Sequence, residues 1–159
     1  MAIAYSVSDD VELLADMRLA YILHEHPDFG EAEIAKMRKA TGGFIRSAHS
    51  ENRYLGFVGV SDGTGGAVAC SAGLLVYDLP PIDSPLPRRV GHVLNFFTLP
   101  EHRRKGYGRG LMEFMIKTAS GRGFDRLVLN ATPDGYPLYV ECGFAESEYA
   151  ALRLQLRKE

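Results

Sequence analysis

One short stretch constrains the fold more than any other part of the chain: the basic, glycine-rich octapeptide RRKGYGRG at residues 103–110. It follows an apolar run at 93–99 and precedes a helical pattern from Leu111 to Ala119. Glycine has no Cβ, so backbone N–H groups can turn inward and a phosphate can come close. The dipole and free N–H groups of a helix N-terminus favour negative charge as well. The order strand, glycine turn and helix therefore predicts a site for a phosphate-bearing ligand.

Spacing excludes two familiar phosphate loops. The Walker string G-x-x-x-x-G-K-S/T does not occur. A dinucleotide fingerprint needs G-x-G-x-x-G and an acidic residue about 20 positions on. Here Gly106, Gly108 and Gly110 are spaced G-x-G-x-G, and the next apolar run ends in Asn130. The pattern that fits is R-x-x-G-x-G, beginning at Arg103.

A second motif lies downstream, LYVECGF at residues 138–144. Together the two motifs resemble the GCN5-related N-acetyltransferases, whose acetyl-coenzyme A signature is Gln/Arg-x-x-Gly-x-Gly/Ala after the fourth strand. That family also carries a Tyr-x-x-x-Gly-Phe segment, and NFFTLPEHR at 95–103 is similar to the end of its fourth strand. The resemblance extends from about Gly91 to Phe144. Both motifs in this order make it specific.

Composition agrees with one compact enzyme domain over residues 1–159. Hydrophobic residues make up 46% and charged residues 24%, which is ordinary for a globular protein. A net charge of −2 argues against a nucleic-acid binder. Cys70 and Cys142 have neither metal-ligand spacing nor a disulfide framework. The chain has no long apolar run and no leader-like N-terminus, so we expect no membrane span and a cytoplasmic location.

The pattern of apolar residues predicts an α/β order of elements. We expect strands at 3–7, 54–60, 67–77, 91–99 and 127–130, with two more near Ala145 and at 151–156. We expect helices at 9–24 (capped by Ser8), 31–49 (interrupted near Gly42-Gly43), 109–121 and 136–142. A hairpin turn is expected at 62–66 and a proline-rich loop at 79–87. This order matches the acyl-CoA N-acyltransferase fold, an α/β (α+β) single domain with a mixed, mainly antiparallel sheet and helices on both faces.

The resemblance implies acetyl-CoA as co-substrate and no metal. The amides of 104–109 would bind its pyrophosphate, and the main chain of 97–99 would hold its pantetheine arm like an added strand. Many relatives carry an asparagine seven residues before the acid tyrosine, where this chain has a threonine. The expected coenzyme-binding residues are Phe97, Thr98, Leu99, Arg103, Arg104, Lys105, Gly106, Tyr107, Gly108, Arg109, Gly110 and Thr132.

Direct transfer of an acetyl group to an amine needs three things besides binding. A backbone N–H of the fourth strand would stabilise the oxyanion. An acid would protonate the leaving thiolate, and the resemblance gives that role to Tyr139, whose phenol is only slightly less acidic than a thiol. A base must take the ammonium proton, but the fourth strand has no carboxylate. Asn95 can only orient a water, and the position of His92 counts against it, so the base stays open.

Simpler interpretations compete with these assignments. Residues 103–105 can be a solvated charge run, and Tyr139 can be a core aromatic. The loop around His24 and His26, rich in acidic residues, can attract a cationic substrate or simply be polar surface. Cys142 lacks an identifiable histidine partner and is better explained as a small buried residue than as a nucleophile.

The leading hypothesis is an acetyl-CoA-dependent N-acetyltransferase acting on a primary amine. The alternatives are a relative that transfers a longer acyl group or acylates a hydroxyl, and a coenzyme A-binding module without turnover. We expect a small-molecule or peptide amine as acceptor, no nucleic acid and no membrane, and leave a homodimer open. The acceptor itself is not identified by the sequence.

Overall fold

A mixed sheet runs through the middle of the molecule in the computed structural model, which describes residues 2–62 and 65–158. Within these residues its strands follow the order β1 (Ile3–Ser8), β2 (Tyr54–Ser61), β3 (Ala67–Leu79), β4 (Arg88–Thr98) and β5 (Arg126–Val128). The first four are antiparallel neighbours, and β5 is parallel to β4. The expected mixed, mainly antiparallel sheet is confirmed.

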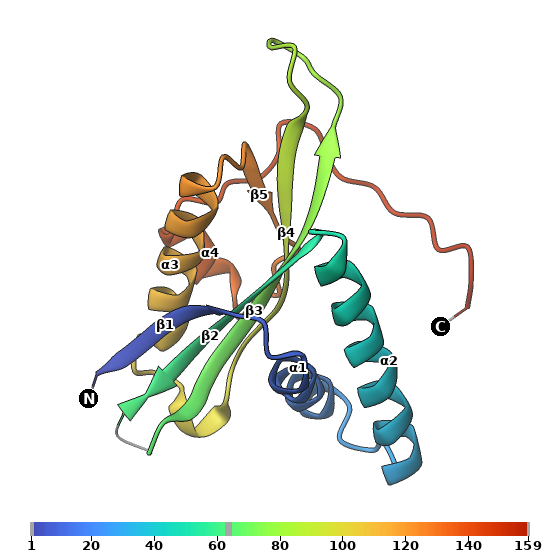
Figure 1. Ribbon diagram of the computed structural model, residues 1–159, viewed down its shortest axis with the longest axis vertical. Helices are drawn as coiled ribbons and strands as arrows, with labels where there is room; N and C mark the ends of the chain where they lie inside the picture. The colour runs from blue at the N-terminus through green and yellow to red at the C-terminus, as the bar shows by residue number, and fades with distance from the viewer. Residues whose placement is uncertain (1, 63–64, 159) are drawn as a thin grey trace.

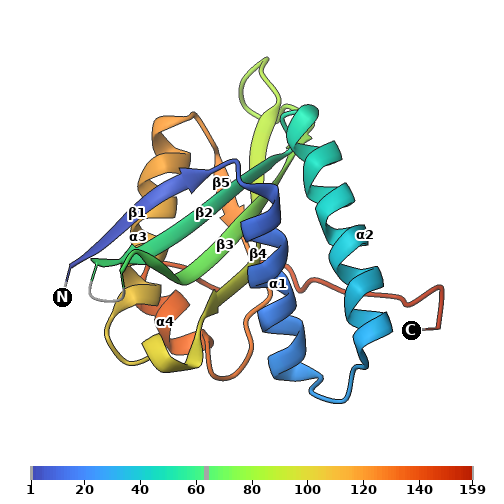
Figure 2. The same ribbon diagram turned by 60° about the horizontal axis from the view of Figure 1, so that its bottom comes forward.

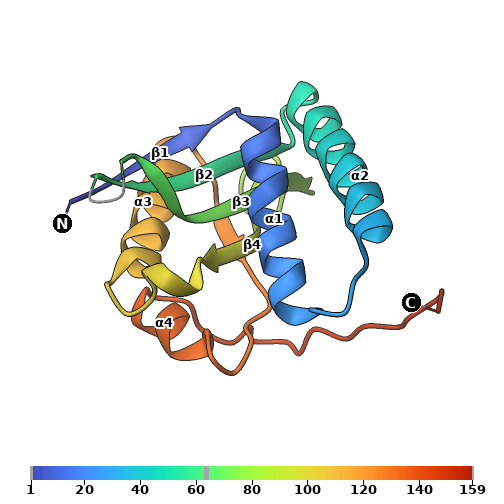
Figure 3. The same cartoon turned by 90° about the horizontal axis from the view of Figure 1, so that it is seen from below.

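Helices cover both faces of this sheet, as expected (Figure 1). Helices α1 (Val11–Glu25) and α2 (Glu31–Ser50) lie on one face, and α3 (Tyr107–Gly121) and α4 (Tyr136–Glu141) on the other. Figure 3 shows the two layers on either side of the strands. The apolar residues of each helix layer pack against the sheet and form a core on that face.

The helix that follows the glycine turn is held by its apolar face. Leu111, Met112 and Met115 are fully buried against the sheet, as their spacing predicts. The hydroxyl of Tyr5 in β1 donates to the carbonyl of Tyr107 at 2.9 Å and ties the start of α3 to the sheet. The position of the turn relative to β4 is therefore fixed by packing along the whole helix.

Two expectations for the N-terminal helices are corrected. The first helix is capped by Asp10, whose carboxylate accepts from the N–H of Leu13 at 3.0 Å, while Ser8 stays in β1 paired with Gly56. The second helix runs without interruption through Gly42-Gly43. Burial of its face against β2 and α1 outweighs the cost of about 1 kcal/mol for each helical glycine.

The other expected bounds differ by a few residues. Strand β4 begins at Arg88, because the β3–β4 hairpin is longer than expected and projects beyond the sheet (Figure 1). Helix α3 begins at Tyr107, and β5 is only three residues long. A short 3₁₀ helix, Pro100–His102, precedes the glycine turn. Residues 63–64 of the expected hairpin turn lie outside the described residues.

The two strands expected near Ala145 and at 151–156 are absent from the described chain. Residues 145–158 carry a strand-like alternation but pair with no neighbour. Figure 2 shows this segment leaving the side of α4 and ending beyond α1 and α2. Alternation alone does not make a strand, because a strand needs a partner for its backbone groups.

Candidate active site

The candidate site begins where β4 and β5 part. The two strands pair only from Val90 with Arg126 to His92 with Val128. Beyond that point β4 carries a bulge opposite Ser71 to Gly73, and Asn95 has a φ of 55°. A cavity of about 240 Å³ lies between the separated chains.

Four segments that are distant in the sequence line this cavity. They are the second half of β4, the chain after β5, one face of α1 and a single residue of α4, with Arg103 at the edge. The lining residues are Tyr21, His24, Glu25, Val93, Asn95, Phe96, Phe97, Arg103, Leu129, Asn130, Thr132, Asp134 and Tyr139.

Tyr139 is the residue of α4 in this lining. Its ring packs edge-on against Phe96 and Phe144, with centroids 5.7 and 6.1 Å away. Gly135 permits this position, because a Cβ there would lie 2.9 Å from the Tyr139 ring. Burial, and then the nearby Tyr21, raise the pKa of the Tyr139 phenol, so it stays protonated at neutral pH.

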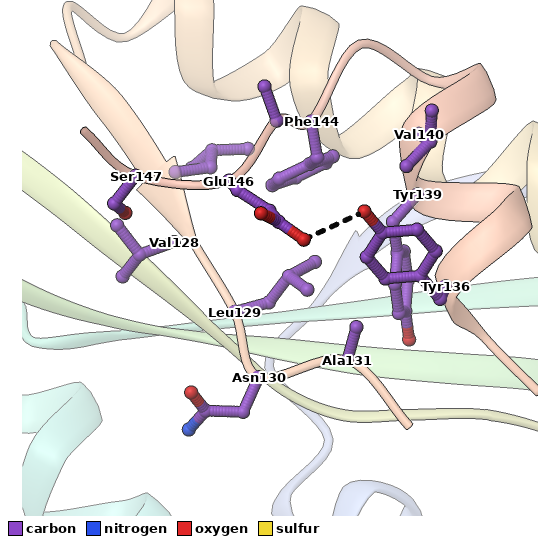
Figure 4. Close-up of a pocket in the computed structure, with 12 residues that line it drawn as sticks. Val128, Leu129, Asn130, Ala131, Tyr136, Tyr139, Val140, Phe144, Glu146 and Ser147 are labelled. Atoms are coloured by element: carbon purple, nitrogen blue, oxygen red, sulfur yellow. Dashed lines mark hydrogen bonds between the residues drawn. The ribbon is translucent and has the colours of Figure 1, made fainter. Parts of the chain in front are cut away.

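The hydroxyl of Tyr139 makes no hydrogen bond to any residue in 2–62 or 65–158. The neighbouring Tyr136 differs, since its hydroxyl donates to the carboxylate of Glu146 at 3.2 Å (Figure 4). Only Tyr139 of this pair lines the cavity between the strands. It is therefore a partly buried acid with its proton available, as its proposed role requires.

The glycine turn lies at the end of β4 and forms a concave backbone surface. Arg104 and Gly106 both have positive φ, 59° and 80°, and α3 begins at the next residue without a side-chain cap. Backbone N–H groups in such a turn and in the first turn of a helix point at a common anion. A Cβ on Gly108 would lie 3.3 Å from Thr98 Oγ1 and 3.7 Å from the ring of Phe96. The turn thus fits a pyrophosphate.

The basic side chains of the turn are mostly engaged elsewhere. Arg103 donates through Nε to the carbonyl of Thr98 at 3.1 Å and stacks over Phe97. Arg109 forms ion pairs with Glu113 and Glu141 at 3.1 and 3.2 Å. The backbone and the helix end, more than these two guanidinium groups, therefore make the turn attractive to an anion.

The backbone groups of Thr98, at the end of β4, point away from β3, and its carbonyl accepts from Arg103, whose side chain lines the cavity. The N–H of Leu99 is already bonded to the carbonyl of Ala69 at 2.9 Å, so it faces β3. Alternate residues of an antiparallel strand face opposite edges, which turns the backbone groups of Thr98 away from β3. Thr132 also lines the cavity, where its hydroxyl accepts from the N–H of Gly135 at 3.2 Å.

Gly110 has a structural reason to be glycine. A Cβ there would lie 2.2 Å from the hydroxyl of Tyr5, and its N–H is used inside the helix by the carbonyl of Gly106. Of the three glycines in the turn, it is the one where an added Cβ would lie under 3.0 Å from another protein atom.

The sequence indicates His24, but not Tyr21, as a residue of the substrate side, and α1 brings both to the cavity. Tyr21, His24 and Glu25 recur at helical spacing and share the face toward β4, with the ring of His24 5.7 Å from that of Phe97. His26 instead stacks on Phe29 outside the cavity. His92 does not line the cavity either, since it belongs to the last pair between β4 and β5.

The side chain of Asn95 is held in place by two neighbouring side chains. Its Oδ1 accepts a hydrogen bond from Arg18 of α1, and the buried hydroxyl of Tyr54 bonds the same side chain. Burial raises the pKa of Tyr54, while Asn95 and the charge of Arg18 act in the other direction. The amide is thus a fixed part of the wall.

Neither thiol is activated. Burial raises the pKa of Cys70 to about 12, and burial also raises that of the partly exposed Cys142. No group of three or more His, Cys, Asp or Glu side chains among the described residues could hold a metal ion. No helix in the same residues is long and apolar enough to cross a membrane.

Comparison with known proteins agrees with this geometry. The model of the acetyltransferase (GNAT) family matches residues 12–144. A GCN5-related N-acetyltransferase from Ralstonia eutropha JMP134 superimposes with a TM-score of 0.74 and 28% identity over 96% of this chain and 99% of that one. A predicted acetyltransferase from Clostridium acetobutylicum, solved with acetyl-CoA, has a TM-score of 0.78 and 22% identity over 98% and 97% of the two chains.

A shorter match connects the chain to glucosamine 6-phosphate N-acetyltransferase 1 of Oryza sativa subsp. japonica. The two are 34% identical over 58 residues, which is 36% of this chain and 35% of that protein. The match thus spans about a third of that relative.

Proposed function

The chain belongs to the acetyltransferase (GNAT) family, and from that premise we propose that it transfers the acetyl group of acetyl-CoA directly to a primary amine. The observation that carries this proposal is the phenol of Tyr139. It lies in the cavity between β4 and β5, protonated and without a hydrogen-bond partner in the described residues. A module that only bound the coenzyme would have no need of an acid at this place.

The residues present fit acetyl-CoA at one end of the cavity. The backbone N–H groups of 104–109 would hold the pyrophosphate at the turn described above. The main chain at Phe97 and Thr98 would hold the pantetheine arm, and Phe97 and Thr132 line the cavity. When bound, the coenzyme supplies the acetyl group as a thioester.

Two side chains would move the protons of the reaction. Tyr139 would donate its proton to the sulfur that leaves as the amide bond forms. His24 is our candidate for the base that accepts a proton from the amine, since histidine accepts protons near neutral pH. Glu25 lines the same cavity and is the alternative base, directly or through a water. No covalent acyl-enzyme is required.

The bulge in β4 supplies the proposed oxyanion donor. At a bulge one residue is left without its partner in the neighbouring strand, and here that irregularity falls at Asn95 and Phe96. A backbone N–H freed in this way would be the donor. Removing one such donor typically costs about 10²–10³ in rate.

Thiol release from acetyl-CoA in the presence of a panel of amines tests the proposal. The panel should include glucosamine 6-phosphate, because one relative is named for that acceptor. Amine-dependent release with formation of the acetylated amine is expected. Binding of coenzyme A without any release would favour a non-catalytic module, and faster release from a longer acyl-CoA would favour a different acyl donor.

A further inference from the structure

A second cavity adjoins the active site on the side of the first two helices. It has a volume of about 340 Å³ and lies between α1, α2 and β4. Its wall is mostly apolar and includes one charged residue, Arg18. The other lining residues are Ala40, Thr41, Phe44, Ile45, Tyr54, Leu94 and Asn95. Asn95 lines both this cavity and the one that contains Tyr139, so the two share a wall.

Arg18 is an unusual cation for such a position. It is half-buried, and the ion pairs among the described residues do not include it. Its guanidinium has five N–H donors, and the bond that it is seen to make goes to the neutral amide of Asn95. A sheltered cation is normally paired with an anion.

We propose that Arg18 binds an anionic group, carboxylate or phosphate, of the amine acceptor. The guanidinium matches both groups because its planar N–H pairs bind two oxygens at once. The anion would lie in the cavity of Arg18 and the amine would reach past Asn95 toward Tyr139. Glu25 and Asp134 line the cavity that contains Tyr139 and favour the ammonium end there. The inference rests on the proposed function and narrows its substrate class.

Matched pairs of amines test this charge preference. Phenylalanine against phenethylamine adds only a carboxylate, and phosphoethanolamine against ethanolamine adds only a phosphate. We expect the anionic member of at least one pair to have a kcat/KM about tenfold or more higher, through a lower KM. The pair that shows the difference identifies the anion.

Variants separate the cation from general effects of charge. Arg18→Gln should reduce the ratio within that pair to near one, and Arg18→Lys should retain part of it. Arg46→Gln is the matched control, because Arg46 is an exposed arginine on α2 outside both cavities. Equal use of both members by the wild-type protein, or a preference that survives Arg18→Gln, would overturn the inference.

Calorimetry on protein saturated with coenzyme A separates this inference from the proposed function. Binding of the anionic member that Arg18→Gln abolishes, without acetyl transfer, would support the anion site and contradict the transferase. Transfer to neutral and anionic amines alike would support the transferase and contradict the anion site. Binding of neither member of either pair would also overturn the anion site.

Discussion

The two ends of the site are built in different ways. At the end proposed for the coenzyme, a continuous segment from Thr98 to Gly108 provides backbone groups, a left-handed glycine and a helix end. At the acceptor end, side chains arrive from α1, α2, β4 and α4, which meet only in the folded protein. A ligand that many enzymes share can be bound by a local sequence motif. Selection of one acceptor depends instead on side chains that the fold brings together from distant parts of the chain.

The largest effect should come from closing the coenzyme end. We expect Gly108→Glu to abolish coenzyme A binding, because a side chain and a like charge would enter the space above Thr98. In wild-type protein, ligand at one hundred times its dissociation constant should stabilise the fold by about 2.7 kcal/mol. Thermal melts with and without coenzyme A measure both.

Gly121→Glu is the matched control at the other end of α3, where a Cβ would meet no atom within 4 Å. It should keep the ligand-induced stabilisation. If Gly108→Glu keeps it too, the coenzyme lies elsewhere and the local motif has another purpose.

The second largest effect is expected at Tyr139, between the two ends of the site. We expect Tyr139→Phe to lower kcat by about tenfold or more, since general acid catalysis is typically worth about 10²–10⁴ and water can substitute in part. Burial raises the pKa of this phenol, so the wild-type rate should fall only above the ordinary tyrosine pKa of 10.0. The variant should lack this alkaline limb. Steady-state rates across pH give both results.

Tyr136→Phe supplies the comparison, because its hydroxyl bonds Glu146 instead of facing the cavity between the strands. It should retain the wild-type kcat. Equal rates for Tyr139→Phe and wild type, with chemistry rate-limiting, would make Tyr139 a packing residue.

A smaller effect is expected at the acceptor end. His24→Gln should lower kcat/KM by about tenfold, because it removes the imidazole proposed to accept the amine proton. The binding of coenzyme A should not change. His26→Gln, which removes a ring stacked outside the cavity on Phe29, should behave as wild type. An unchanged kcat/KM in His24→Gln would shift the role to Glu25.

The same contrast explains what the sequence could predict. The order of strands and helices up to α4 and the place of the glycine turn depend on local periodicity and spacing, and these were confirmed. The lining by Tyr21 and Arg18 could not be predicted, because helical spacing shows that residues share a face but not what the face contacts. The prediction of a strand in the C-terminal tail was wrong for a related reason. Alternation at 151–156 indicates a strand, but pairing depends on a partner that lies elsewhere.

The smallest effect on function should come from a glycine of the same motif that serves the fold. A Cβ at Gly110 would lie 2.2 Å from the Tyr5 hydroxyl, so Gly110→Ala should destabilise the protein by about 1–3 kcal/mol through overpacking. Coenzyme affinity per folded molecule should hold, because the N–H of Gly110 is bonded to Gly106 inside the helix. Urea unfolding and calorimetry measure the two quantities separately.

Tyr5→Phe removes the closest atom and, with it, the hydrogen bond to the carbonyl of Tyr107. In that background Gly110→Ala should cost less than in wild type, since part of the clash is gone, whereas Gly121→Ala should be near neutral in both. A loss of coenzyme affinity in Gly110→Ala without loss of stability would contradict this assignment. Gly110 would then belong with Gly108 among the residues that hold the ligand, and the local motif would extend two residues further.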